Sequence, residues 1–168
     1  MPLIYLVAAG GTIEKVYSEQ TGTVRNEDSK IERYFRLLRL PDAEVRTTYV
    51  MNKDSLDMTD ADRRKVLDAI HGLLAARPAP VVVTHGTDTM VETGRLLQKE
   101  LTGLQYPIVM TGAMTPLGFE GSDGLQNLTE SLFAARTLPP GVWLVMHNQV
   151  FPIDHVRKDR EKARFVAT

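Results

Sequence analysis

The fold is decided by the stretch Leu3-Ile4-Tyr5-Leu6-Val7-Ala8-Ala9-Gly10-Gly11-Thr12, where an apolar run ends in a glycine turn that presents a hydroxyl. A second stretch repeats this design, because Val81-Val82-Val83 runs into Thr84-His85-Gly86-Thr87-Asp88-Thr89. Short apolar runs of this kind are typical of strands buried on both faces of a parallel sheet. Loops at the carboxyl ends of such strands build the ligand site. We therefore expect Thr12, Thr87 and Asp88 to lie at one site and to act on a small polar substrate.

Apolar runs bounded by turn signals predict five strands, and periodic segments between them predict four helices. The strands are expected over residues 3–8, 44–50, 80–84, 107–111 and 142–146. The helices are expected from about 28 to 40, from 60 to a stop before Pro78, from about 91 to 101, and from about 122 onwards. Strands that alternate with helices indicate an α/β fold, with a three-layer, doubly wound, mainly parallel sheet flanked by helices. The length of 168 residues fits one domain, 1–168.

The composition excludes several classes of protein. Twenty basic and 21 acidic side chains give a formal net charge of −1, which offers no electrostatic case for binding nucleic acid. The sequence has no cysteine, and its four histidines show no metal-ligand spacing; His85 is expected to be a buried structural imidazole. No stretch approaches a membrane span, and the N-terminus lacks the basic region of a signal peptide. We expect a cytoplasmic protein that uses no metal or cofactor and binds no membrane.

The polar stretch Lys15–Glu27 has no apolar period and follows Thr12 directly. A structureless insertion beside a candidate nucleophile suggests a mobile lid, and an ordinary connecting loop is the alternative.

Three segments together resemble the signature segments of the bacterial-type L-asparaginases: Gly10-Gly11-Thr12-Ile13, Thr84-His85-Gly86-Thr87-Asp88-Thr89-Met90 and Thr111-Gly112-Ala113-Met114-Thr115-Pro116. Asp54-Ser55 and Lys158 follow in the order that this family predicts. The resemblance extends from about Leu3 to about Lys158, and the chain ends soon afterwards. The chain is therefore similar to the N-terminal domain alone, as in short-chain asparaginases, and the C-terminal domain of the family is expected to be absent.

This resemblance implies an amidohydrolase that converts L-asparagine to L-aspartate and ammonia through a threonine nucleophile, with L-glutamine as a second substrate and without a cofactor. The implied catalytic residues are Thr12, Tyr17, Thr87, Asp88 and Lys158. The implied substrate-binding residues are Gly11, Asp54, Ser55, Gly86 and Ala113. The resemblance assigns the turn Gly121–Gly124 to structure or to subunit contacts.

The chemistry of these residue types fits that role. A threonine hydroxyl needs a base or a chain of hydrogen bonds to become a nucleophile. Tyr17 is the nearest phenol to Thr12, and a lysine near Thr87 can lower the pKa of its hydroxyl or take its proton. Structural alternatives stand beside each role: a helix cap for the threonine turns, a simple turn for Asp54-Ser55, and a solvated terminal segment for the charge run Arg157–Lys162.

Two-domain relatives complete their site with an acidic residue from the C-terminal domain of a neighbouring subunit, and no residue of this chain matches it. A second copy can close the pocket instead, so we expect a homodimer or a homotetramer. Two other classes of function fit the same residues: a non-catalytic sensor of asparagine or aspartate, and an ammonia-supplying subunit of an amidotransferase. Ammonia release by the isolated chain distinguishes the amidohydrolase from the sensor and from the amidotransferase subunit.

Overall fold

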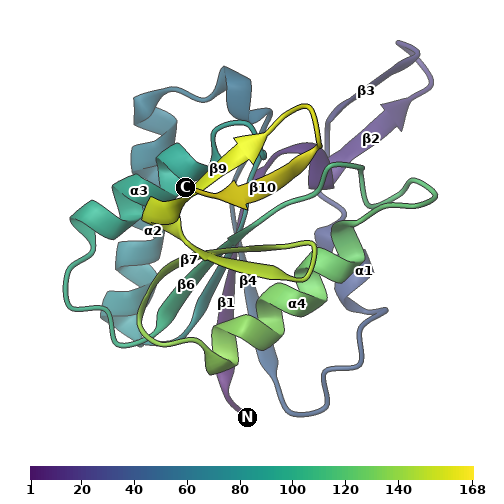
Figure 1. Ribbon diagram of the computed structural model, residues 1–168. Coiled ribbons are helices and arrows are strands. Elements are labelled where there is room, and N and C mark those ends of the chain that lie inside the picture. Colours follow the sequence, from purple (N-terminus) through teal and green to yellow (C-terminus); the bar gives the residue numbers. More distant parts are fainter.

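A six-stranded sheet forms the centre of the molecule (Figure 1). The computed structural model describes all 168 residues. The strands of the sheet are β1 Leu3–Gly10, β4 Glu44–Lys53, β5 Val81–Thr84, β6 Pro107–Thr111, β7 Gly141–Met146 and β8 Gln149–Pro152. They lie in the order β4-β1-β5-β6-β7-β8; the first five are parallel, and β8 is antiparallel to β7. The five predicted strands are confirmed, and β8 adds an edge strand that the sequence pattern does not predict.

The sequence of β1 explains how the sheet divides the core. Leu3, Tyr5 and Val7 belong to an apolar cluster of 23 buried residues, whereas Ile4 and Leu6 belong to a second cluster of 13. Successive side chains of a strand point to opposite faces, so one continuous apolar run supplies both clusters. The strands β1, β5 and β6 are buried along their whole length, as expected when both faces of a parallel sheet are covered.

Helices cover both faces of the sheet (Figure 1). They are α1 Ile31–Phe35, α2 Asp60–Ala76, α3 Met90–Glu100 and α4 Gly124–Thr137, and the short 3-10 turns are η1 Thr12–Glu14, η2 Ser55–Asp57 and η3 Ile153–His155. Ile70 of α2 and Leu97 of α3 pack in the larger cluster, while Ile31 of α1 and Leu128 of α4 pack in the smaller one. The predicted three-layer α/β fold is confirmed. None of these helices combines the length and the apolar character needed to cross a membrane.

The first predicted helix is wrong in length. The sequence predicts a helix from about 28 to 40, but α1 covers only Ile31–Phe35. Its N-cap residue Lys30 makes no capping hydrogen bond, the Ile31 N–H makes only a long one of 3.5 Å to Ser29 Oγ, and Ile31 is its only fully buried residue. By contrast, α2 begins with a reciprocal capping box, in which Thr59 and Asp62 bond to each other's backbone N–H at 3.0 and 3.2 Å. A helix with so weak a cap and with one fully buried residue has little to extend it.

The sequence pattern also does not predict two exposed hairpins. The strands β2 Lys15–Ser18 and β3 Thr23–Asn26 pair antiparallel, so the stretch 15–27 is a hairpin and not a structureless insertion. The strands β9 Val156–Asp159 and β10 Arg164–Ala167 form the second hairpin, which contains most of the charge run that we expected to be a solvated terminal segment. A hairpin needs backbone pairing and a suitable turn more than an apolar period, and Gly22 supplies a positive φ of 65° in the first one.

Candidate active site

The candidate active site lies where the strand order reverses, at the carboxyl ends of β1 and β5. From β1 the chain crosses to β4 on one side and then returns to β5 on the other side. Ligands of α/β proteins bind at such topological switch points. Gly11, with a φ of +86°, lies against the turn after β5, and a Cβ there would lie 2.3 Å from the backbone nitrogen of Gly86. Glycine is therefore required for the two loops to meet.

Lys158 connects the C-terminal hairpin to the turn after β5. Its Nζ lies 2.7 Å from Oγ1 of Thr87 and 3.0 Å from Oδ1 of Asp88. Thr87 is 5% exposed, and the side chains of Lys158 and Asp88 are 17% and 24% exposed. The structure thus brings three of the predicted catalytic residues into one group. Partial removal from water strengthens the attraction between its charges.

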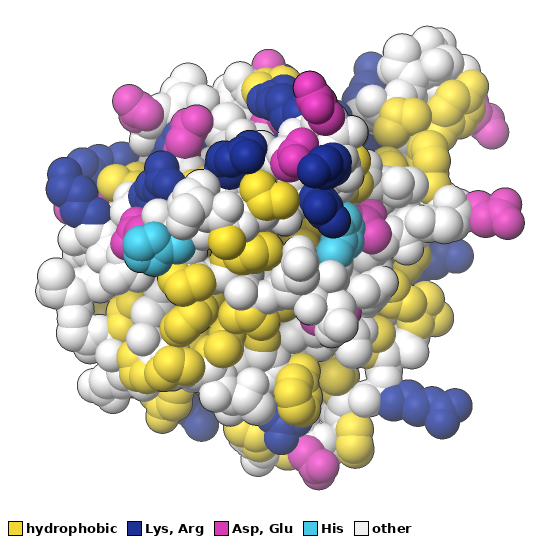
Figure 2. Space-filling view, viewed as in Figure 1, with side chains coloured by type: hydrophobic (Ala, Val, Ile, Leu, Met, Phe, Trp, Pro, Cys, Tyr) yellow, Lys and Arg dark blue, Asp and Glu magenta, His cyan; other side chains and the backbone are white.

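Arg160 joins this group, and the sequence pattern does not reveal it. Its Nη2 lies 3.1 Å from the same Oδ1 of Asp88 that accepts from Lys158. In Figure 2, side chains of both signs gather over the part of the surface that β9 and β10 occupy in Figure 1. Two cations share one oxygen of Asp88, and Oδ2 of the same carboxylate accepts no hydrogen bond from the protein.

Ser55 reaches the site from the loop after β4. It is buried, its Oγ accepts a hydrogen bond from the backbone N–H of Thr89 at 3.3 Å, and its carbonyl oxygen accepts one from Thr89 Oγ1 at 2.9 Å. A Cβ on Gly86 would lie 2.5 Å from Ser55 Oγ. Of the predicted substrate-binding residues, Gly86 therefore lies against both Gly11 and Ser55.

Asp54 is held by Lys15, a residue that the sequence pattern does not single out. The Nζ of Lys15 lies 2.5 Å from Oδ2 of Asp54, and the backbone N–H of Leu56 donates to Oδ1 at 3.1 Å. The hydrogen bond from Lys15 is the main reason that the pKa of Asp54 lies below its ordinary value of 3.8. Asp54 thus anchors the β2–β3 hairpin beside the site. Its part in substrate binding stays a prediction.

Thr12 opens η1 directly after Gly11 and is half-buried. Asn26, at the end of β3, donates from Nδ2 to the carbonyl oxygen of Gly11 at 2.9 Å and so fixes this loop. Tyr17 lies on β2 opposite Val24, is 58% exposed and forms no hydrogen bond with Thr12. The structure therefore does not bring the predicted phenol to the predicted nucleophile.

Ala113 follows β6 and is fully buried at the same edge of the sheet. Asp123 orders this loop by accepting hydrogen bonds from the backbone N–H groups of Met114 and Thr115, at 3.0 and 2.9 Å. Burial raises the pKa of Asp123, but these bonds and one from His147 outweigh it, so the net shift is downward. The turn Gly121–Gly124 thus has a structural role, which is one of the two roles predicted for it.

His85 is a buried imidazole, as predicted. It is 0% exposed, its Nδ1 lies 2.9 Å from the carbonyl oxygen of Gly86, and its Nε2 lies 2.8 Å from Oγ1 of Thr93. Burial lowers the pKa of His85 to about 4, so its ring is neutral near pH 7. No group of three or more His, Cys, Asp or Glu side chains is placed to hold a metal ion.

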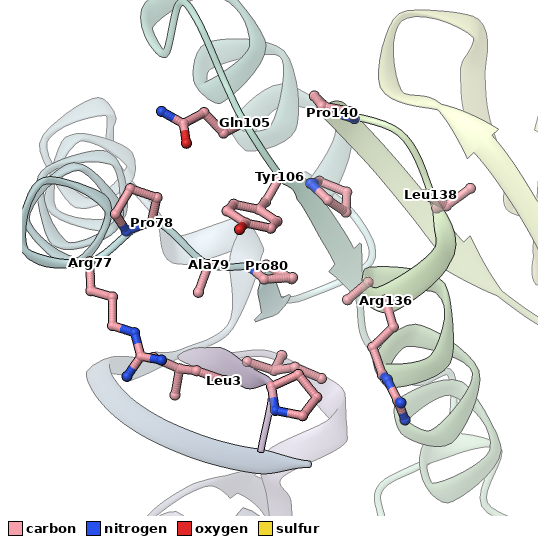
Figure 3. Close-up of a pocket in the computed structure, with 14 residues that line it drawn as sticks. Leu3, Arg77, Pro78, Ala79, Pro80, Gln105, Tyr106, Arg136, Leu138 and Pro140 are labelled. Carbon is pink, nitrogen blue, oxygen red and sulfur yellow. The ribbon is translucent and has the colours of Figure 1, made fainter. Parts of the chain in front are cut away.

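A hollow of about 480 Å³ lies at the opposite edge of the sheet, at the amino ends of the strands (Figure 3). Figure 3 shows Pro78, Pro80 and Tyr106 around it, with Arg77 and Arg136 at its margins. Its lining has no Ser, Thr, Lys, His, Asp or Glu side chain. The chemistry-bearing side chains therefore place the candidate site at the carboxyl ends of the strands, away from this hollow.

The switch point, the glycine contacts and the Thr–Asp–Lys group define an α/β protein whose polar site lies at the carboxyl ends of its parallel strands. A family model described as Asparaginase, N-terminal matches residues 3–165, and the chain belongs to this family. It is 31% identical over 154 residues to L-asparaginase 1 of Escherichia coli strain K12, covering 88% of this chain and 45% of that protein. It is 32% identical over 149 residues to a glutamyl-tRNA(Gln) amidotransferase subunit of Aeropyrum pernix, covering 87% of this chain and 35% of that one.

The fold comparison agrees with the sequence comparison. The thermostable L-asparaginase from Thermococcus kodakarensis superposes with a TM-score of 0.84 at 25% identity, over 98% of this chain and 51% of that chain. The chain therefore spans about half the length, or less, of the relatives named here.

Proposed function

We propose that residues 1–168 act as one catalytic domain that hydrolyses the side-chain amide of L-asparagine to L-aspartate and ammonia, with L-glutamine as a second substrate. The observation that carries this proposal is Lys158 Nζ, 2.7 Å from Thr87 Oγ1 and 3.0 Å from Asp88 Oδ1. A lysine beside a buried hydroxyl is one arrangement that activates a nucleophile for acyl transfer. Membership of the asparaginase family supports the choice of an amide substrate.

Thr12 is the nucleophile in this proposal. Its Oγ1 bonds to the amide carbon, the C–N bond breaks, and the hydroxyl proton leaves with the nitrogen as ammonia. Water then adds to the acyl-enzyme, which releases aspartate and restores the Thr12 hydroxyl. Thr87 and Lys158 activate this water. In an alternative assignment of roles, Thr87 and Lys158 instead activate the first attack on the amide carbon. Tyr17 accepts or passes a proton only if the β2–β3 hairpin moves toward Thr12, since it is 58% exposed on that hairpin.

The remaining groups bind the substrate. Ser55 and backbone N–H groups of the turn after β5 suit the α-carboxylate, and Oδ2 of Asp88 suits the α-ammonium group. The carbonyl of Ala113 orients the side-chain amide. Backbone N–H groups near Gly11 and Thr87 stabilise the negative oxygen of the tetrahedral state. A second copy of the chain closes the exposed side of this site in a homodimer or homotetramer, and we place the protein in the cytoplasm.

Ammonia release from L-asparagine and, separately, from L-glutamine tests the proposal. We expect fast release by the purified protein and a loss of at least about a hundredfold in Thr12→Val and in Lys158→Met. Thr102→Val and Lys162→Met are matched controls, because both positions are exposed in the folded chain. A slow substrate should add mass at Thr12. A label that persists in Thr12→Val would exclude Thr12 as the nucleophile.

A second candidate function is supported by the similarity to the amidotransferase of Aeropyrum pernix. In that role the same site would release ammonia for a partner rather than act alone. A wild-type protein that folds and binds asparagine, but releases ammonia only when a partner is added, would favour this candidate.

A further inference from the structure

Arg63 is a buried cation for which the proposed reaction has no use. It lies on α2 and is 9% exposed. Its Nη1 donates to Oγ1 of Thr89 at 3.1 Å and to Oγ1 of Thr93 at 3.2 Å, and its Nη2 donates to a carboxylate oxygen of Glu92 at 3.1 Å. Burying a guanidinium is costly unless its donors meet well-placed acceptors. Two of its acceptors are hydroxyls that lead directly to the candidate active site.

A guanidinium only donates, so both hydroxyls accept from Arg63, and each keeps its single proton to donate elsewhere. The Thr89 hydroxyl must donate onward, to the carbonyl oxygen of Ser55 at 2.9 Å. The Thr93 hydroxyl lies 2.8 Å from Nε2 of His85, and it donates to that nitrogen because the ring proton lies on Nδ1. The carbonyl oxygen of Gly86 only accepts, so the proton of the neutral His85 ring lies on Nδ1, 2.9 Å from that oxygen. Two chains of hydrogen bonds thus run outward from one side chain.

Both chains end at groups that the proposed reaction uses. His85 holds the carbonyl of Gly86, and in a planar trans peptide the next N–H points the opposite way. By holding the carbonyl of Gly86, His85 therefore also sets the direction of the Thr87 N–H, which lies in the same peptide plane. The second chain holds the backbone of Ser55, while the N–H of Thr89 donates to Ser55 Oγ at 3.3 Å.

We propose that Arg63 is a positioning residue for the proposed hydrolysis. Through Thr93 and His85 it orients the Thr87 N–H that stabilises the negative oxygen of the tetrahedral state. Through Thr89 it holds Ser55 in place for the substrate carboxylate. The inference rests on the proposed function, and it assigns a different kinetic consequence to each chain of hydrogen bonds.

Steady-state kinetics with L-asparagine separate the two chains. Thr93→Val removes the bond to His85 and should lower kcat by about tenfold or more with KM within about twofold, because it disturbs a group used in the transition state. Thr89→Val should raise KM by about tenfold with kcat within about twofold, because it releases Ser55. Arg63→Lys should show both effects, since one ammonium lacks the fork geometry that holds two hydroxyls. Arg64→Lys, at the exposed neighbouring position, is the control.

The proposal is overturned if Thr93→Val and Thr89→Val, each with the wild-type circular dichroism spectrum, keep the wild-type kcat and KM. These two variants decide the question even if Arg63→Lys does not fold. Equal defects in kcat and KM in both variants would indicate a merely structural role and would also overturn it.

Nitrogen-15 NMR of the His85 ring gives a readout that does not depend on turnover. We expect the Nδ1–H tautomer in the wild type and a shifted Nε2 resonance in Thr93→Val and Arg63→Lys. An Nε2–H tautomer in the wild type would show that the hydrogen bonds run the other way. If the protein folds with the expected tautomer and releases no ammonia, the proposed function fails while the positioning network stands.

Discussion

Glu14 lies two residues after Thr12, and its carboxyl group is almost fully buried. It is 4% exposed, its Oε1 accepts a hydrogen bond from Ser29, and its Oε2 has no partner. Burial is the main reason that the pKa of Glu14 lies above its ordinary value of 4.5. A carboxyl with a raised pKa favours the folded state when protonated. The stability that this protonated carboxyl contributes is complete below pH 4.5, the ordinary pKa, and is lost as the pH rises through the folded-state pKa.

We therefore expect Glu14→Gln to be more stable than the wild type near neutral pH, with a Tm higher by about 2–4 °C. The substitution keeps the shape of the side chain and removes the buried charge. The difference should shrink as pH falls toward 4.5. Thermal unfolding at several pH values measures it, with Glu19→Gln on the exposed hairpin as the control. A glutamine variant that is less stable at neutral pH would contradict this interpretation of Glu14.

Arg160 and Lys158 bond to the same oxygen of Asp88 but differ in exposure. The side chain of Arg160 is 67% exposed, whereas that of Lys158 is 17% exposed and also reaches Thr87. We expect Arg160→Gln to change kcat by less than about threefold, because exposed ion pairs contribute little. Under the proposed function, kinetics beside Lys158→Met check this ranking. A larger loss of kcat in Arg160→Gln than in Lys158→Met would indicate that Arg160, and not Lys158, is the main catalytic cation.

At the scale of the elements, two side chains, Lys15 and Asn26, tie the β2–β3 hairpin to the site. Lys15 bonds to Asp54, and Asn26 bonds to Gly11 and to Asn52 at 2.9 and 2.7 Å. The rest of the hairpin is mostly exposed, with Tyr17 at 58% and Val24 at 40%. Elements with few buried contacts open locally at low free energy. This arrangement fits the lid role that we predict for residues 15–27.

We expect Asp54→Asn to loosen the hairpin, because it removes the ion pair with Lys15. Amide hydrogen exchange at Val16 and Val24 should speed up by several-fold, while β1 stays protected. In the wild type the lowered pKa of Asp54 means that the ion pair is fully present above pH 3.8 and is lost as pH falls through the folded-state pKa. Glu44→Gln removes an exposed ion pair far along β4 and serves as the control. Unchanged exchange in Asp54→Asn would show that Asn26 alone holds the hairpin.

On the scale of the whole molecule, the site is assembled from loops at one edge of the sheet and from one hairpin. Figure 2 shows charged side chains of both signs over the upper part of the drawn face and hydrophobic ones over its lower part. Phe133 of α4 is 69% exposed and Val150 of β8 is 47% exposed. Single exposed apolar side chains are common on protein surfaces, and only a contiguous patch indicates an interface. The second copy that we propose has to cover the carboxyl ends of the strands, where the candidate site lies, whereas Phe133 lies near Ile4, toward the amino end of β1.

We predict that activity falls on dilution, in step with dissociation of the oligomer. Sedimentation velocity and ammonia release, measured over the same concentrations, test this. Specific activity should fall by about half where half of the chains are monomeric, if only the oligomer is active. A monomer with full specific activity would refute the role of the second copy.

Local patterns in the sequence were enough to predict the five parallel strands of the central sheet and most of the helices. The apolar run of β1 can be buried only if both of its faces are covered, and Thr59 with Asp62 starts α2 by contacts within one turn. Motif order placed Gly11, Ser55 and Thr87 at one edge of the sheet, because parallel strands bring their carboxyl ends together. These features depend on neighbours in sequence or on strand direction alone.

The tertiary structure alone decided the contacts that join distant segments. Lys158 meets Asp88 across 70 residues of sequence, Lys15 meets Asp54 across 39, and Arg63 meets Thr93 across 30. The pairing of β9 with β10 brings Lys158 to the site, and the local pattern of this mixed charge run does not reveal that contact; only the family resemblance named Lys158 from the sequence. Sequence determines an element when its own pattern can be buried in only one way, whereas a polar contact is determined only when the packed fold brings donor and acceptor within reach.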